Sequence, residues 1–77
     1  MEIKQAMIEA KETDLWFRPI SWKGSGQAIV VRIGNYCGDV LQIVPSAKGG
    51  IDWIATAKEI LDDWEVVSPD VVCNERG

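Results

Sequence analysis

The sequence predicts an α+β domain: a small antiparallel sheet with an N-terminal amphipathic helix and a short C-terminal helix before the last strand. Three patterns lead to this prediction. They are apolar residues at helical spacing near the N-terminus, two β-branched runs separated by turn residues, and a capping box ahead of a final apolar run. A chain of 77 residues suits one small domain. We expect that domain to span residues 1–67, with residues 68–77 as a C-terminal tail.

The first helix is predicted from about residue 2 to residue 12. Four apolar residues fall on one helical face, at spacings i, i+3, i+4 and i+7: Ile3, Ala6, Met7 and Ala10. A β-prone run at 15–18 follows, and Pro19 limits this strand because proline cannot donate to a sheet ladder.

A hairpin is predicted in the middle of the chain. Residues 27–33 are rich in β-branched side chains, which favour a strand. Residues 34–39 have turn composition, and residues 40–44 form the returning strand. Loops are expected on either side of the hairpin, at 21–26 and 45–50, because both segments contain glycine pairs.

A capping box marks the start of the second helix. The Thr56 hydroxyl can accept from the amide of Glu59, and the Glu59 carboxylate can reach back to the Thr56 amide. The helix is expected at 57–62. Residues 64–67 then read as the last strand, which Pro69 limits.

The charge distribution disfavours a partner such as long DNA or RNA. Net charge is −4. Residues 1–14 carry −2 and residues 59–77 carry −5, whereas residues 15–58 carry +3 from five basic and two acidic side chains. Tight binding of a long nucleic acid requires many phosphates to be neutralised. The central segment still suits a small ligand with a few phosphates, and a solvated mixed surface is the alternative interpretation.

The residue types give little support for catalysis or metal binding. The chain has no histidine, so Cys37 lacks a base that would activate it. Cys37 and Cys73 have no zinc-type spacing, and the aspartates lack an EF-hand pattern. We therefore expect no catalytic residue, no metal and no cofactor.

The first residues are polar and helical rather than signal-like, and no apolar run approaches the roughly 20 residues that span a bilayer. We therefore expect a cytoplasmic chain with reduced thiols and no membrane partner. A domain this small buries little surface, so self-association is expected to supply additional burial.

Two of the four tryptophans, Trp22 and Trp53, are candidate ligand contacts. Trp22 lies in a glycine-rich loop beside Lys23, which suits stacking on a base next to a phosphate contact. Trp53 precedes the capped helix, whose first amides suit a phosphate; packing onto that helix is the alternative. Trp16 and Trp64 fall in predicted strands and are expected in the core or in a subunit contact.

Three charged side chains complete the candidate site: Asp63, Arg18 and Lys23. Asp62 and Asp63 follow a helix C-terminus, where the dipole disfavours acids. This suggests a role in accepting hydrogen bonds from a sugar or base, although a solvated acidic patch also explains them. Arg18, like Lys23, is included as a phosphate contact on charge grounds alone.

These motifs resemble the Thoeris anti-defence 2-like family of small phage and prophage proteins. Trp22-Lys23-Gly24-Ser25-Gly26 is similar to the family's W-x-G-K-G segment. Asp52-Trp53-Ile54-Ala55-Thr56 and Leu61-Asp62-Asp63-Trp64-Glu65-Val66-Val67 are similar to P-W-L-A-S followed by L-A-E-D-W-E-V. The resemblance covers about residues 3 to 67. The chain departs from the pattern in placing Lys23 before the first loop glycine and threonine instead of serine at position 56.

The resemblance implies a non-enzymatic sponge in the cytoplasm of an infected bacterial cell. Such proteins bind cyclised ADP-ribose isomers, and some relatives bind the cyclic di- or trinucleotides of CBASS immunity. They form homo-oligomers with pockets between protomers, so this chain would form a dimer or a tetramer. Trp22, Trp53, Thr56 and Asp63 would contact the ligand. The alternatives are a sponge for CBASS nucleotides alone, or a protein–protein inhibitor that uses exposed tryptophans and the acidic C-terminal region.

Overall fold

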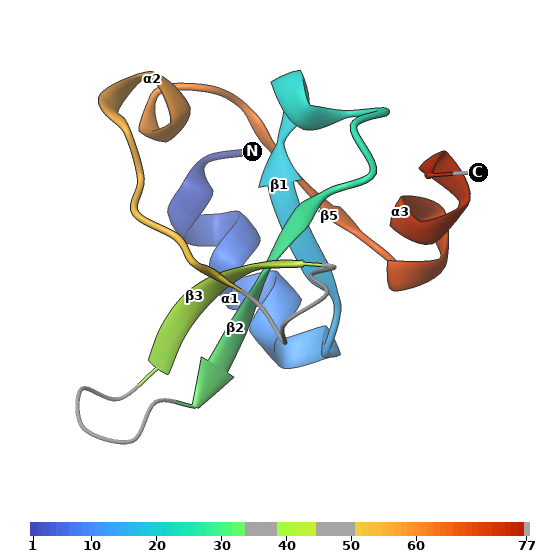
Figure 1. The fold of residues 1–77 in the computed structure, drawn as a ribbon. Helices are drawn as coiled ribbons and strands as arrows, with labels where there is room; N and C mark the ends of the chain where they lie inside the picture. The colour runs from blue at the N-terminus through green and yellow to red at the C-terminus, as the bar shows by residue number, and fades with distance from the viewer. Residues whose placement is uncertain (34–38, 45–50, 77) are drawn as a thin grey trace.

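The computed structural model describes residues 1–33, 39–44 and 51–76, and it has the α+β class that the sequence predicts (Figure 1). The elements follow in the order α1 (Ile3–Thr13), β1 (Trp16–Pro19), the 3-10 turn η1 (Ile20–Trp22), β2 (Ala28–Ile33), β3 (Asp39–Val44), β4 (Ile51–Asp52), α2 (Ala57–Ile60), β5 (Trp64–Val67) and α3 (Pro69–Glu75). The N-terminal helix and the short helix before the last strand are confirmed. The predicted hairpin turn and the loop at 45–50 lie outside the described residues, as does Cys37.

The strands form one antiparallel sheet in the order β4-β3-β2-β1-β5. β2 and β3 pair along six residues each, from Ala28 opposite Val44 to Ile33 opposite Asp39, which confirms the predicted hairpin strands. β1 pairs with β5 over four residues. The last strand of the chain therefore lies beside the first, at the edge of the sheet (Figure 1).

Helix α1 packs its predicted apolar face on the sheet. Ala6 and Ala10 are buried in the main core with Phe17, Ile29 and Trp64. The partly buried side chains of Ile3 and Met7 pack against the same cluster. The i, i+3, i+4, i+7 stripe is thus confirmed, and its alanines allow the helix backbone to lie close to the aromatic side chains.

The expectation that residues 68–77 form a tail was wrong, because Pro69–Glu75 form helix α3. Ser68 caps this helix: its Oγ accepts from the amide of Val71 at 3.4 Å. Pro69 stands in the first turn, where its fixed φ and missing N–H cost nothing. Val72 is fully buried in a second cluster with Ala28, Val67 and Trp16. The packed unit therefore extends beyond residue 67.

None of the helices within the described ranges is long and apolar enough to cross a membrane.

Candidate functional site

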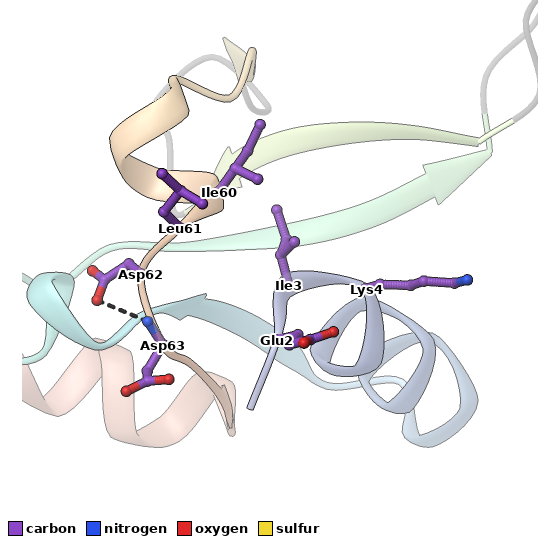
Figure 2. Close-up of a pocket in the computed structure, with 7 residues that line it drawn as sticks. All are labelled: Glu2, Ile3, Lys4, Ile60, Leu61, Asp62 and Asp63. Carbon is purple, nitrogen blue, oxygen red and sulfur yellow. Dashed lines mark hydrogen bonds between the residues drawn. The ribbon is translucent and has the colours of Figure 1, made fainter.

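Two segments far apart in the sequence line a surface hollow of about 410 Å³ (Figure 2). They are the start of α1 and the link from α2 to β5, and their lining residues are Glu2, Ile3, Lys4, Ile60, Leu61, Asp62 and Asp63. This volume is in the range of small-molecule sites. A second hollow of about 420 Å³ is lined by α1 alone, at Gln5, Ile8, Glu9 and Glu12. Only the first hollow contains residues of the candidate site.

Trp64 holds the two lining segments together. Its backbone amide donates to the carbonyl of Met1 at 2.7 Å, and the amino group of Met1 donates to the Trp64 carbonyl at 3.1 Å. The indole N–H of Trp64 donates to the Glu59 carbonyl at the end of α2 at 2.9 Å. The ring itself is buried in the core, so the sheet edge fixes the geometry of the hollow.

The two aspartates form an acidic end of the hollow. The Asp62 Oδ1 accepts from the amide of Asp63 at 2.8 Å (Figure 2). A hydrogen bond from the Ser21 side chain lowers the pKa of the Asp62 carboxyl below its usual range. The amide of Ile20 donates to the Asp63 carbonyl at 2.8 Å, so η1 is hydrogen-bonded to the backbone at this end of the hollow. Carboxylates arranged in this way accept hydrogen bonds from hydroxyl or amino groups and repel phosphate.

Apart from the acidic Glu2, the remaining wall of the hollow is apolar or basic. Ile3 points towards Ile60, whereas Lys4 extends away from the aspartates at the opposite side (Figure 2). Leu61 is 86% exposed, and Ile54, which precedes α2, is 88% exposed. Single exposed aliphatic side chains are common on protein surfaces, whereas a large contiguous apolar patch marks a contact surface.

Trp22 and Trp53 are brought together, as a shared site requires, but they also pack on the core. Their rings meet edge to face, with centroids 6.4 Å apart and planes at 88°. Trp53 meets Trp64 at 5.7 Å, and Trp64 meets Phe17 at 5.5 Å. Both candidate rings are half-buried. The core position expected for Trp64 is confirmed, while base stacking by Trp22 and Trp53 stays a prediction.

The capping box is confirmed in full and engages the candidate contact Thr56. The Thr56 Oγ1 accepts from the Glu59 amide at 3.3 Å and donates to Glu59 Oε1 at 2.8 Å. The Thr56 amide donates to the same carboxylate at 3.1 Å. At the start of α2 these bonds occupy two amides: the Thr56 amide, which donates to the Glu59 carboxylate, and the Glu59 amide, which donates to the Thr56 hydroxyl. The side chain of Lys23 is exposed on the loop before β2.

Arg18 differs most from its predicted role, because the side chain is only 1% exposed. Its Nε donates to Glu65 Oε2 at 2.7 Å, and its two terminal nitrogens donate to the carboxylate of Glu75. Both carboxylates raise the pKa of Arg18 further above its ordinary value. The guanidinium is therefore enclosed within the protein rather than presented to a ligand at the surface. Sequence reasoning missed Glu65 and Glu75, which lie 47 and 57 residues away.

No cluster of three or more potential metal ligands is found in the part of the chain that the structure describes. The chain matches no model of a known protein family, no curated protein and no solved structure.

Proposed function

We propose that this chain binds and sequesters a cyclic nucleotide messenger without transforming it, as the resemblance to the Thoeris anti-defence 2-like family implies. The observation that supports this most is the hollow at Leu61–Asp63, because it lies on the segment with the most specific resemblance. Cyclised ADP-ribose isomers are the first candidate ligands, and cyclic di- or trinucleotides are the second.

The polarity of the hollow suits such a ligand. The carboxylates of Asp62 and Asp63 would accept hydrogen bonds from ribose hydroxyls or a base amino group. The aliphatic wall of Ile3 and Ile60 would cover the flat part of the ligand. Ligand phosphates would lie away from the aspartates, on the side that Lys4 occupies (Figure 2). One end therefore selects hydrogen-bond donors, while at the other end Lys4 offers a positive charge that the neighbouring Glu2 partly offsets.

Self-association would complete the site. Leu61, which lines the hollow, is largely exposed, and covering it removes apolar area from water at about 25 cal/mol per Å². A second copy placed over this region would also close the hollow around its ligand. The assembly would then be a homodimer or a tetramer, as the resemblance implies.

A thermal-shift panel of the purified protein tests the proposal against cyclic ADP-ribose isomers and cyclic di- and trinucleotides. A ligand at 100 times its dissociation constant adds about 2.7 kcal/mol to the free energy of unfolding, which is readily measured in a domain this small. The ligand released by heating should be chemically unchanged. A shift with oligonucleotides alone would favour the second candidate, and no shift with any member of the panel would contradict sequestration.

Asp63→Asn and a matched control test whether the ligand binds in the hollow. Asp63→Asn keeps the side-chain shape, removes the charge and should weaken binding at least about tenfold, since a charged hydrogen bond contributes about 1.5–3 kcal/mol. Glu12→Gln, in the last turn of α1 and outside this hollow, is the matched control and should bind normally.

Leu61→Ser tests self-association. It should reduce the molar mass of the assembly measured by light scattering.

The exposed Leu61 beside the acidic pair Asp62 and Asp63 also favours a second candidate function, inhibition of a protein partner. Aliphatic side chains, rather than the exposed tryptophans expected from the sequence, would form its contact surface. This function predicts no effect of any nucleotide on melting. It also predicts loss of the partner when Asp62 and Asp63 are changed to lysine.

A further inference from the structure

The carboxylate of Glu75 sits in a ring of donors that resembles a receptor for an anion. Two donors are the terminal nitrogens of Arg18, with Nη2 at 2.8 Å from Oε2. The other two are the backbone amides of Gly24 and Gly26, at 3.0 Å and 3.2 Å. A bidentate guanidinium combined with convergent loop amides is a common way for proteins to hold a phosphate or carboxylate.

The receptor is built without help from helix α3. Gly24 and Gly26 have φ of 84° and 75°, a left-handed backbone that turns both amides inwards. The loop is held by its own bonds, including the Ser25 amide to the Trp22 carbonyl at 2.9 Å and the Gln27 amide to Ser25 Oγ at 3.2 Å. All the donors to Glu75 therefore come from residues 18–26.

Arg18 also stays oriented independently of Glu75. Its Nε is bonded to Glu65 on the neighbouring strand β5, which leaves the two terminal nitrogens directed at the loop. Because this anchor does not involve α3, the guanidinium would keep its direction if Glu75 left.

Glu75 enters the receptor from outside, on the last helix of the described chain. Helix α3 is seven residues long and buries a single side chain, Val72, among its own residues. Its polar contact with the loop is made by one carboxylate group, with two oxygens and one negative charge, and the side chain of Arg76, just after α3, lies against Gly26. A phosphodiester group presents the same charge and the same number of unbridged oxygens.

We propose that Arg18, Gly24 and Gly26 form a phosphate-binding site and that Glu75 occupies it as an internal substitute, so that helix α3 is an autoinhibitory plug. A phosphate of a diester or diphosphate ligand displaces Glu75 and releases the C-terminal end of α3. This inference does not depend on the hollow beside Asp63, and it stands if no nucleotide binds there. An anion site needs an ionised occupant, and Glu75 meets this requirement because the hydrogen bonds from Arg18 hold its pKa at about 2.

The test uses inorganic pyrophosphate, which has neither base nor ribose and so does not report on the hollow. The wild-type chain, Glu75→Ala and the control Asp70→Ala are titrated at constant ionic strength. Asp70 is an exposed acid in the first turn of α3. Binding is followed through the amide resonances of Gly24 and Gly26. Glu75→Ala should bind at least about tenfold more tightly than the other two, because its site is already open.

If Glu75→Ala does not fold, Glu75→Gln takes its place, since the amide keeps the side-chain shape while removing the charge. In wild type, saturating pyrophosphate should shift the Gly24 and Gly26 amides and also the amide of Val72 as α3 is released. A folded Glu75 variant with unmoved glycine amides at millimolar pyrophosphate would show that Glu75 only neutralises Arg18, and would overturn the proposal. If neither variant folds, unmoved glycine amides in wild type would overturn it.

Discussion

Replacement of Val72 by alanine tests whether α3 is an integral part of the domain. Val72 is 0% exposed and packs with Ala28, Val67 and Trp16. The change removes two buried methyl groups, which at about 0.8 kcal/mol each contribute about 1.6 kcal/mol of transfer free energy. The cavity left behind adds to this, so we expect a total loss of about 2 kcal/mol in the free energy of unfolding.

Thermal and urea melts followed by circular dichroism and tryptophan fluorescence measure this loss. For a domain of 77 residues, about 2 kcal/mol lowers Tm by roughly 8–16 °C. Val71→Ala is the matched control, because Val71 is on the same helix and is 46% exposed; it should change stability by less than about 0.5 kcal/mol. Equal melting temperatures for the two variants would refute the packing of α3 and restore the tail expected from the sequence.

Two other predictions concern the buried polar contacts. The pKa of Glu75 is about 2 instead of 4.5 because Arg18 donates to its carboxylate. Ionised Glu75 therefore stabilises the folded state. This stabilisation is complete above pH 4.5 and is lost as the pH falls towards 2. Urea midpoints between pH 7 and 2 should show the loss, and Glu75→Gln should flatten it. Trp64→Phe removes the bond to the Glu59 carbonyl and leaves a space, so urea unfolding should show a loss of about 2–3 kcal/mol; a loss below about 1 kcal/mol would contradict the role of Trp64 in joining the segments.

The parts of the fold that could be predicted are those determined by residues close in sequence. The stripe from Ile3 to Ala10 needs only a helical period, and the structure buries Ala6 and Ala10 as that period requires. The Thr56–Glu59 capping box is a contact across three residues, and all its bonds are present. The hairpin strands likewise follow from β-branched runs separated by turn residues.

Helix α3 was missed although a local signal for it exists. Ser68, Pro69 and Asp70 form a good helix start, with a cap, a proline in the first turn and an early acid. Only Val72 is buried on this helix, so the segment has no apolar period to reveal it. The bonds from Arg18, Gly24 and Gly26 to Glu75 span 49 to 57 residues and leave no local pattern.

The candidate site was predictable in its parts but not in its arrangement. Trp22 and Trp53 are each candidate ligand contacts from sequence, whereas their mutual edge-to-face packing depends on the tertiary fold. Arg18 was assigned to a ligand because charge alone does not reveal an internal partner. The hollow itself requires Glu2–Lys4 and Ile60–Asp63 to meet, which only the sheet edge at Trp64 explains.

The placement of β5 beside β1 has a consequence for how the chain folds as it is synthesised. Arg18 and Glu65 are partners across 47 residues, and translation proceeds at about 5–20 residues per second. Strand β1 therefore leaves the ribosome roughly 2–9 seconds before its outer neighbour. Throughout that interval Arg18 has neither of its carboxylate partners, and the edge of β1 is open to other strands. Nascent chains are accordingly most prone to mispairing in this interval, which ends when β5 is added to the sheet.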